Sequence, residues 1–456
     1  MRLLVECSYV YDHPLDNSGI QRVVRNIISK LGNTQKIADT IPVILKNNKI
    51  YEVKRLFPDS FNMYIGNRLH YRLIRASERY WSYYDRIEKT WPFSASLNMR
   101  RGLFILCKFL GVFFNLSILI ISRLCERGEI GNRIVELAVK PGDVLILLDS
   151  SWHSNFLAQV KELKSQGVAI VTVIYDLIPL THPRFCDDGL VVVFQRWFKW
   201  VSQTADGFMS ISKTIRDQAQ AYALQGIAEA KPQHQWFDYF HLGSELDFVQ
   251  KNGRVGQKVK KVFQNGCPVY LMVGTIEPRK NHEYLLDAFD LLWQKSLGVN
   301  LCFVGKVGWK CQALIKRVKT HSEYKRRLFM FHDLSDTELE YCYLKSRSLV
   351  FPAYVEGFGL PLVEAMQRGL PAMASDIPVF REVGGDFIAY FDPEKPETLM
   401  ALIRHYEESG EFPASRKMEE WSWLNWEDSA KQLLTRIVSH ITTPHIETNS
   451  RSQAEI

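Results

Sequence analysis

A repeated succession of short apolar runs and helical patterns constrains the fold of this chain more than any other feature. The runs Val144–Leu148, Val168–Tyr175 and Gly207–Ile211 are mostly apolar, and each stops at polar residues before a helical pattern begins. Runs without polar alternation are typical of parallel strands that are covered on both faces. The succession therefore predicts an α/β fold, in which ligands gather at the carboxyl ends of the strands.

The succession occurs twice along the chain. A strand over Leu3–Val10 and a helix over Ile20–Leu31, with Ser18 as its N-cap, open the first series. The second series begins near residue 268, after the polar, Lys-rich stretch Lys251–Lys261. Its strands are expected at Val269–Val273, Asn300–Val304, Leu328–Phe331 and Ser348–Phe351. We therefore expect two Rossmann-like domains that face each other across a cleft.

A basic and aromatic segment interrupts the first series. From Arg68 to Arg101 there are eight Arg or Lys residues against three acids, with tyrosines and tryptophans between them. Leu103–Ser122 follows, with fifteen apolar residues among twenty. Its length would suit a membrane span, but a span would separate two strands of one sheet, and Lys108, Gly111, Asn115 and Ser122 form a weak polar stripe. We expect an interfacial helix, and the alternatives are a helix packed on the protein's own core and an oligomer contact.

Composition excludes several classes of protein. The chain has 456 residues, 46% hydrophobic and 23% charged, which is ordinary for a globular protein of two domains. Its net charge of +7 suits phosphate-bearing ligands or an anionic membrane, but indicates no nucleic-acid binder. The eight cysteines form no CxxC pair, so neither a zinc site nor a redox dithiol is expected. The N-terminus lacks the long apolar core of a signal peptide.

The strongest chemical motif is Glu356-Gly357-Phe358-Gly359-Leu360-Pro361-Leu362-Val363-Glu364. It follows the strand Ser348–Phe351, and Pro361 suits the first turn of a helix. The glycines allow the backbone to approach a ligand, and a helix N-terminus favours a diphosphate. The carboxylates can accept hydrogen bonds from sugar hydroxyls. A glycine-rich loop with a capping glutamate is the alternative interpretation.

A second motif, Gly274-Thr275-Ile276-Glu277-Pro278-Arg279-Lys280-Asn281, lies between a strand and a helix. Gly274 permits a close turn, and Arg279 and Lys280 supply a guanidinium fork and a point charge for phosphate oxygens. In isolation this stretch would be read as a solvated basic loop. Its place at a strand end, in the same half as the glutamate motif, favours a ligand site.

With these motifs the second half resembles the retaining glycosyltransferases of family 4, which have the GT-B fold. The resemblance covers Val269–Asn281, Phe351–Glu382 and, more weakly, Ser335–Tyr343, and Trp423–Ala430 looks like the family's closing segment. In the first half, Ser18–Val23, Tyr175–Pro179 and Ser210–Lys213 look like bacterial polysaccharide mannosyltransferases. The resemblance omits residues 50–135.

The resemblance implies an arrangement of domains. Residues 1–250 would bind the acceptor, with a membrane-associating insertion at about 60–130, and residues 251–425 would bind the nucleotide sugar. Residues 426–443 would form a helix that crosses back to the first domain. Residues 444–456 are expected to be a disordered tail.

Roles for donor-side residues follow from the resemblance. Arg279 and Lys280 would hold the donor diphosphate, and Gly19 would face it from the first helix. Glu356 would contact the transferred sugar and Glu364 the ribose. Other residues expected to line the donor site are Gly274, Gly305, Leu334, Gly357, Phe358, Gly359 and Leu360.

The acceptor side is less specific. Many relatives have a His before the Asp of Asp176-Leu177-Ile178-Pro179, and here that residue is Tyr175, so a role for the His does not carry over. Asp176 remains an acceptor-side and catalytic candidate beside Glu356, Arg279 and Lys280. His153 and His241 are further candidates, or else structural histidines. Asp149 is a candidate, or else a helix N-cap.

The sequence contains no DxD-type carboxylate pair for a metal, so the cations and helix N-termini are expected to neutralise the leaving group. The missing pair predicts an enzyme that needs neither a metal nor a cofactor. The resemblance implies that it is retaining and that it moves a hexose, first of all mannose from GDP-mannose, to a lipid-linked glycan of an O-antigen, capsule or related polysaccharide. UDP-sugars, dTDP-rhamnose and a non-catalytic scaffold are the alternatives. The expected place is the cytoplasmic face of the cell membrane, bound through residues 64–123, with other polysaccharide-assembly enzymes as possible partners and no nucleic acid.

Overall fold

The structure is a computed structural model, and it describes residues 1–13, 19–54, 56, 72–73, 76–77, 79–81, 83–84, 87–88, 96–129, 133–154, 156–225, 235–245 and 253–442. The expected N-cap Ser18 and the tail 444–456 lie outside the described residues. Contacts divide the chain into two compact units. Unit 1 comprises Met1–Val10, Asp16–Ile41 and Val139–Ile456, and unit 2 comprises Tyr11–Leu15 and Pro42–Ala138.

The first half of unit 1 is built on parallel strands. They are β1 (Arg2–Glu6), β5 (Val144–Leu147), β6 (Ala169–Ile174), β7 (Gly207–Ser210) and β8 (Trp236–Tyr239), hydrogen-bonded in that order. The residues of β1, β5, β6 and β7 are almost all buried, as the apolar runs predict, because helices cover both faces, whereas β8 is mostly half-buried. The helices of this half are α1 (Ser8–Asp12), α2 (Gly19–Lys30), α5 (Leu157–Ser165), α6 (Ile178–Thr181), α7 (Asp188–Thr204) and α8 (Lys213–Gln225).

The second half of unit 1 has a sheet of its own, with the order β11-β10-β9-β12-β13-β14 and parallel pairing throughout. These strands are β9 (Val269–Val273), β10 (Asn300–Val304), β11 (Leu328–Phe331), β12 (Ser348–Phe351), β13 (Ala372–Ser375) and β14 (Ala389–Phe391). The helices are α9 (Gln257–Val262), α10 (His282–Gln294), α11 (Gln312–Thr320), α12 (Asp336–Lys345), α13 (Leu360–Gln367), α14 (Pro378–Gly384) and α15 (Pro396–Ser409). Two Rossmann-like halves are thereby confirmed.

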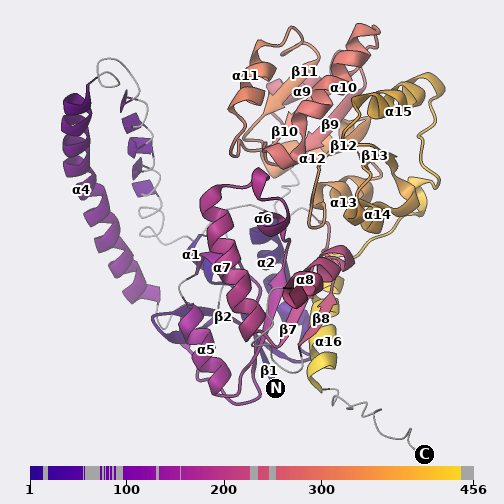
Figure 1. The fold of residues 1–456 in the computed structure, drawn as a ribbon. Coiled ribbons are helices and arrows are strands. Elements are labelled where there is room, and N and C mark those ends of the chain that lie inside the picture. The colour runs from indigo at the N-terminus through magenta and orange to yellow at the C-terminus, as the bar shows by residue number, and fades with distance from the viewer. Residues whose placement is uncertain are drawn as a thin grey trace, which may run out of the picture. The chain divides into compact units, whose positions relative to one another are not determined.

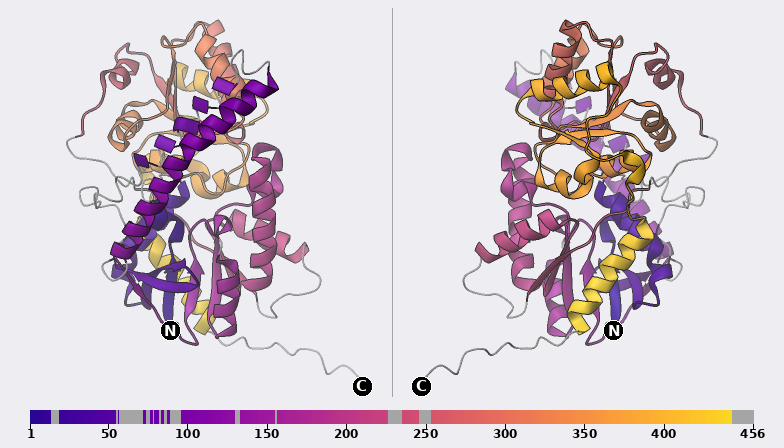
Figure 2. Two further views of the ribbon diagram at one scale, coloured as in Figure 1. Left: turned by 90° about the vertical axis from the view of Figure 1, so that its left-hand side faces the viewer. Right: turned by 90° about the vertical axis from the view of Figure 1, so that its right-hand side faces the viewer.

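The last helix, α16 (Trp426–Thr442), packs against the first half. It contacts α2 and β8, and its buried face includes Trp426, Leu433 and Ile437. Figure 1 and Figure 2 show this helix, in yellow, beside the indigo and magenta elements of the first half. The chain thus returns to the half in which it began.

The first strand is shorter than predicted. Leu3–Val10 was expected to be one strand, but β1 ends at Glu6 and α1 begins at Ser8. The carboxylate of Glu6 accepts the backbone N–H of Ser8 at 2.7 Å, and Asp149 accepts that of Val10 at 2.7 Å. These two acceptors satisfy N–H groups at the start of a helix, which an apolar pattern alone does not reveal.

Unit 2 contains the inserted segment. Its strands β2 (Asp39–Lys46), β3 (Lys49–Val53) and β4 (Ile134–Glu136) pair antiparallel, and Asn47 and Asn48 make the β2–β3 turn with φ of 51° and 58°. The helix α4 (Leu97–Glu129) has 33 residues and extends beyond the expected Leu103–Ser122 at both ends. Its stretch Leu97–Ile118 has a mean hydropathy of 1.6 and suffices by length and composition to cross a membrane.

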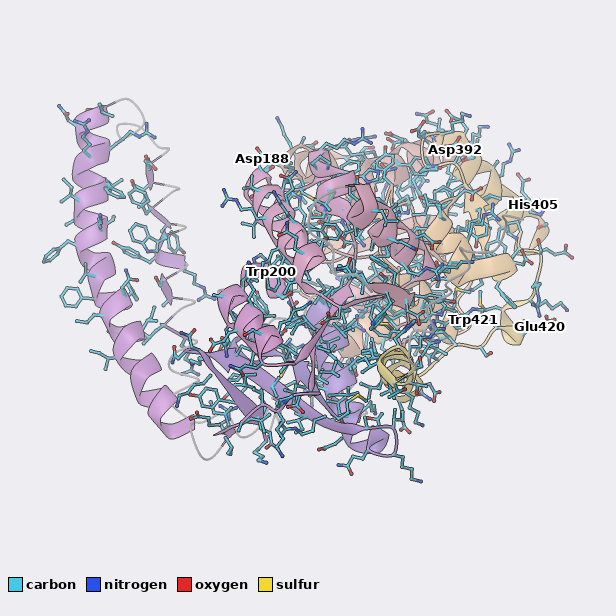
Figure 3. The ribbon with its side chains drawn as sticks, turned by 60° about the horizontal axis from the view of Figure 1, so that its bottom comes forward. Asp188, Trp200, Asp392, His405, Glu420 and Trp421 are labelled. Atoms are coloured by element: carbon cyan, nitrogen blue, oxygen red, sulfur yellow. The ribbon has the colours of Figure 1, made fainter. Side chains whose placement is uncertain are left out.

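Tyr80 and Trp81 cover one narrow face of α4. The Tyr80 hydroxyl donates to the Cys107 carbonyl at 2.9 Å, and a Cβ on Gly111 would lie 2.9 Å from the Trp81 ring. Gly111 is therefore a packing position, whereas Lys108 and Asn115 of the predicted polar stripe are exposed. Figure 3 shows aromatic rings that project from the opposite side of α4.

Candidate active site

A cavity of about 760 Å³ lies between the two halves of unit 1, where the carboxyl ends of the strands meet. Its volume is typical of a pocket for a small ligand. Gly19 and Asp176 line it from the first half, and Arg279, Lys280 and Glu356 from the second. The cavity therefore brings together residues that the sequence analysis assigned to the donor and to the acceptor.

Glu356 is the centre of a buried charged cluster. Its Oε1 lies 2.8 Å from Nη1 of Arg279 and also contacts Nζ of Lys280. Nη2 of Arg279 lies 2.7 Å from Oε1 of Glu277. Burial raises the pKa of Glu356, but Arg279 and Lys280 outweigh it, so the pKa is lowered. Glu356 is thus held as a carboxylate, and the two cations are held where a phosphate could reach them.

Glycines shape the loop 274–281, which carries Arg279 and Lys280. Gly274 directly follows β9 and has φ of 150°, and a Cβ there would lie 3.6 Å from Cε of Lys280. A Cβ on Gly305 would lie 1.8 Å from the carbonyl oxygen of Gly274, so no side chain is possible at position 305. Lys280 Nζ also lies 4.8 Å from the ring centroid of Phe351. The loop is therefore rigidly packed around Lys280.

The glutamate motif is fitted against the first half. A Cβ on Gly357 would lie 2.1 Å from the carbonyl oxygen of Tyr175, and Oγ of Ser212 donates to the Gly357 carbonyl at 2.9 Å. Gly359 has φ of 97°, and α13 begins at the next residue, Leu360. The start of α13 therefore faces the cavity, as the motif predicts.

Glu364, in the first turns of α13, is 1% exposed. Its Oε2 accepts the hydroxyl of Tyr343 at 2.7 Å, and its Oε1 lies 2.6 Å from Nη2 of Arg22. Arg22 belongs to α2 in the first half. The carboxylate expected at the ribose is thus joined to a cation that the sequence analysis did not single out.

Asp176 lies beside the charged cluster at the end of β6. Its Oδ1 accepts the backbone N–H of Ile178 at 3.0 Å. Burial raises its pKa, and Arg279 opposes that effect. Tyr175 also lines the cavity, but its hydroxyl donates to the Leu148 carbonyl at 2.7 Å and burial places its pKa well above the usual value. Of these two neighbours, Asp176 is the better proton acceptor.

Asp149 and His241 are held by structural contacts. Asp149 is 1% exposed and accepts the backbone N–H of Val10 and of Ser150, each at 2.7 Å. Burial, together with Asp149, raises the pKa of its neighbour Glu6 to about 8. Nε2 of His241 lies 2.8 Å from Oε1 of Glu382. Neither Asp149 nor His241 lines the cavity, whereas His153 does.

Sequence reasoning missed an aromatic wall on the first half. Tyr9, Trp152 and Phe194 line the cavity together with His153. The ring centroids of Trp152 and Phe194 are 5.6 Å apart, and those of Tyr9 and His153 are 6.2 Å apart. These rings come from three separate elements, so only the Trp152-His153 pair was visible as a local signal.

The remaining predicted donor residues also line the cavity. They are Gly274, Gly305, Leu334, Phe358, Gly359 and Leu360. Among the residues that the structure describes, no group of three or more His, Cys, Asp or Glu is arranged to hold a metal ion. The described cavity therefore offers cations, carboxylates and backbone N–H groups as its polar chemistry.

Two parallel Rossmann-like sheets with a cavity at their carboxyl ends define the GT-B class of glycosyltransferase folds. The chain is similar to HepE of Anabaena, solved with UDP-glucose, at a TM-score of 0.51 and 13% identity over 97% of each chain. It is similar to sucrose-phosphate synthase of Thermosynechococcus elongatus at a TM-score of 0.51 and 14% identity over 96% of each chain. At such identities these likenesses show the fold alone.

The sequence comparisons identify the second half more closely. Residues 256–420 match the family "Glycosyl transferases group 1". It is 32% identical over 300 residues to the serotype-specific mannosyltransferase WbdA of Escherichia coli, covering 65% of this chain and 37% of WbdA. It is 26% identical over 251 residues to the O-antigen chain mannosyltransferase RfbU of Salmonella typhimurium, covering 54% and 62% of the two chains. The chain thus spans little more than a third of the length of WbdA.

Proposed function

We propose that this chain is a retaining, metal-independent glycosyltransferase that moves mannose from GDP-mannose to a lipid-linked glycan in envelope polysaccharide synthesis. The observation that carries the proposal is the Glu356 carboxylate held by Arg279 and Lys280 at the cavity. The names of WbdA and RfbU support mannose and an O-antigen-like product.

The leaving group would be stabilised by charge that the protein itself provides. Arg279 and Lys280 would hold the donor diphosphate, with the N-termini of α2 and α13 on either side. A Cβ on Gly19, the first residue of α2, would lie 3.9 Å from Cδ1 of Leu360, so these two helix starts face each other closely. Preorganised cations and helix ends can neutralise a leaving diphosphate without a metal ion.

Glu356 would position the transferred sugar and would not attack it. Its carboxylate is fixed by two cations, so its oxygens are suited to accept hydrogen bonds from sugar hydroxyls. The acceptor hydroxyl would lose its proton to the leaving phosphate, on the same face of the sugar, which gives retention. Asp176, whose pKa burial raises, would orient that hydroxyl. Glu364 would bind the ribose, and Gly305 and Leu334 would lie near the base.

Unit 2 would hold the enzyme at the cytoplasmic face of an anionic membrane. Residues 68–123 have ten basic and three acidic side chains, a net +7 that equals the net charge of the whole chain. The rest of the chain is therefore neutral, and all of its excess charge lies in the segment that includes most of α4. Exposed apolar side chains form a stripe on that helix: Ile105, Phe109, Val112, Phe113, Leu116 and Ile120. Basic charge beside an apolar stripe suits anionic lipid.

Vesicle flotation tests the membrane proposal. We expect the wild-type protein to bind phosphatidylglycerol vesicles more than phosphatidylcholine vesicles, and the double variant F109D/F113D to bind at least about tenfold less. Val192→Asp is the matched control, because Val192 is also an exposed apolar residue, 45% accessible, but lies on α7. Wild-type protein that binds neither vesicle would contradict the proposal, and self-association in sedimentation would then indicate that α4 contacts a second copy.

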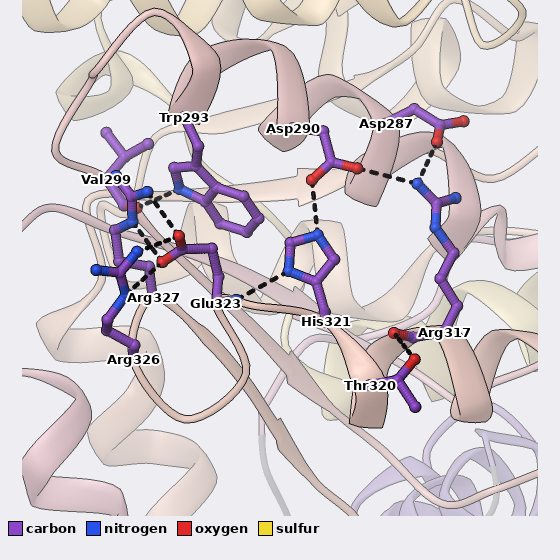
Figure 4. A network of polar contacts seen from close by, with 10 residues as sticks. All are labelled: Asp287, Asp290, Trp293, Val299, Arg317, Thr320, His321, Glu323, Arg326 and Arg327. Atoms are coloured by element: carbon purple, nitrogen blue, oxygen red, sulfur yellow. Dashed lines mark hydrogen bonds and ion pairs between the residues drawn. The ribbon is translucent and has the colours of Figure 1, made fainter.

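Thermal stabilisation by nucleotides tests the donor proposal. Protein in EDTA is heated with GDP, UDP, TDP or ADP, and a ligand that binds only the folded state raises the midpoint. We expect GDP to give the largest shift, and Arg279→Ala or Glu364→Ala to remove it. Arg317→Ala is the control, because Arg317 pairs with Asp287 at 2.6 Å and Asp290 at 3.1 Å in the network of Figure 4, away from the cavity lining.

The same four nucleotides also distinguish the proposed GDP-mannose donor from other donors and from a non-catalytic scaffold. A shift by UDP or TDP in place of GDP would indicate a UDP-sugar or dTDP-rhamnose donor. No shift with any nucleotide in EDTA would contradict the metal-independent donor site and would favour a non-catalytic scaffold.

A further inference from the structure

The two oxygens of Glu364 both have partners within the protein. Tyr343 donates to Oε2 at 2.7 Å, and Nη2 of Arg22 lies 2.6 Å from Oε1. The pair is shielded from water, because the side chain of Glu364 is 1% exposed and that of Arg22 is 15% exposed. Arg22 comes from α2 of the first half, and Glu364 from α13 of the second.

A nucleotide whose ribose binds Glu364 has to compete with the existing partners of this carboxylate. Two ribose hydroxyls need acceptor oxygens, but Tyr343 already donates to Oε2 and Arg22 already pairs with Oε1. A ribose hydroxyl that binds Oε1 must displace Arg22 or share this oxygen with it. Displacing Arg22 from Glu364 breaks a shielded ion pair, which is costly unless another anion takes the place of the carboxylate.

The charge balance of the cavity shows where that anion would come from. Arg279 and Lys280 are already paired with Glu277 and Glu356, and the carboxyl group of Asp176 lies beside them, so these two cations are not in excess over the acids. A nucleoside diphosphate brings further negative charge into this cluster. Arg22 lies in the first turn of α2 and lines the same cavity as Arg279 and Lys280.

We infer that Arg22 is a donor-positioning residue that exchanges partners, from Glu364 to the donor diphosphate, when ribose hydroxyls take the Glu364 carboxylate. The inference rests on the proposed nucleotide-sugar site. The charge-assisted contact of Arg22 with Glu364 is lost, and a similar contact of Arg22 with the diphosphate is formed. A diphosphate ligand therefore recovers the free energy that is lost when the ribose displaces Arg22. A nucleoside without phosphates cannot recover it. The exchange would also couple the binding of the ribose by Glu364 of the second half to the binding of the phosphates by Arg22 of the first half.

Calorimetric titration with GDP, GMP and guanosine tests the exchange. The variants are Arg22→Gln and Arg22→Lys, with Arg317→Gln as a charge-matched control away from the cavity lining. In Arg22→Gln we expect GDP to bind about 10- to 100-fold more weakly, from the loss of one charged hydrogen bond, while guanosine binds as well or better. Arg22→Lys, which keeps the charge but not the fork, should fall between wild type and Arg22→Gln. Arg317→Gln should match wild type.

Other results would overturn the inference. If Arg22→Gln binds GDP and guanosine more tightly by the same factor, Arg22 is a competitor and not a phosphate ligand. If it binds both more weakly by the same factor, Arg22 only supports the structure. Wild-type protein that prefers UDP requires the same titration with UDP, UMP and uridine. Wild-type protein that binds no nucleoside diphosphate contradicts the proposed function itself, and the exchange falls with it.

Discussion

Glu382 provides the sharpest test of how the two halves of unit 1 are joined. It lies on α14 in the second half and accepts the backbone N–H of Lys213 at 2.7 Å and of Thr214 at 2.9 Å. The Thr214 hydroxyl donates to it at 2.7 Å, and Nε2 of His241 lies 2.8 Å away. Lys213 is the first residue of α8, so a carboxylate of one half caps a helix of the other. We predict that Glu382→Gln destabilises the protein at neutral pH.

The magnitude follows from the pKa. Burial acts to raise the pKa of Glu382, but the hydrogen bonds from His241 and Thr214 outweigh it and lower the pKa to about 2. Against an ordinary value near 4.5, at about 1.4 kcal/mol for each pKa unit, the upper bound is about 3 kcal/mol. Part of the side chain remains in contact with water, so screening reduces the expected loss to about 1.5 kcal/mol.

The pH dependence has a definite sign. A lowered folded-state pKa stabilises the fold above the unfolded pKa, and this contribution is lost as the pH falls from about 4.5 toward 2. Urea unfolding from pH 7 to pH 3.5 measures the free energy of unfolding of wild type and of Glu382→Gln. The difference between these two free energies should become smaller below about pH 4.5. The control is Glu420→Gln, because the exposed Glu420 labelled in Figure 3 pairs with Arg416 on the surface. A difference in the free energy of unfolding that stays constant over this pH range, or is under about 0.5 kcal/mol at pH 7, would refute a stabilising role of the Glu382 carboxylate.

Three further predictions concern the cavity. Glu356→Gln should lower transfer by at least about 100-fold while GDP still binds, because it removes a group that acts on the sugar, and unchanged turnover would contradict this. Gly357→Ala should lower stability by about 1–3 kcal/mol, because its Cβ would lie 2.1 Å from the Tyr175 carbonyl oxygen, and an unchanged melting midpoint would be incompatible with that packing. Trp152→Ala should raise the KM for the acceptor several-fold without changing GDP affinity, because its ring lines the cavity from the first half, and a change in GDP affinity instead would place it on the donor side.

The sequence predicted most strands of unit 1, because most of them are continuous apolar runs, but no strand was predicted at β13 (Ala372–Ser375) or β14 (Ala389–Phe391). The strand over Val144–Leu148 was predicted to within one residue of β5, and Val269–Val273 agrees with β9. The end of β1 was missed because Glu6 and Asp149, 143 residues apart in sequence, cap α1 together. Capping by a distant carboxylate leaves no local pattern.

Some residues of the candidate site could also be predicted from local motifs, whereas others depend on contacts that only the fold creates. Glu356, Arg279 and Lys280 were recognisable because each lies in a short motif at a strand end. The partner of Glu364 was not, because Arg22 lies on the other half and only the fold brings the two together. His241 was selected for its place after a strand, but it binds Glu382 of the other half. Long-range ion pairs are set by the packing of domains, which single-sequence patterns do not encode.

The central claim is best tested by following labelled mannose. GDP-[14C]mannose is incubated in EDTA with lipid extract and either wild-type protein or Glu356→Gln, and label in the lipid fraction is counted. The account predicts that wild-type protein transfers label without added metal, that Glu356→Gln does not, and that UDP-[14C]glucose is not used. Label that stays in GDP-mannose with wild-type protein, or that moves to lipid only when a divalent metal is added, would contradict the account.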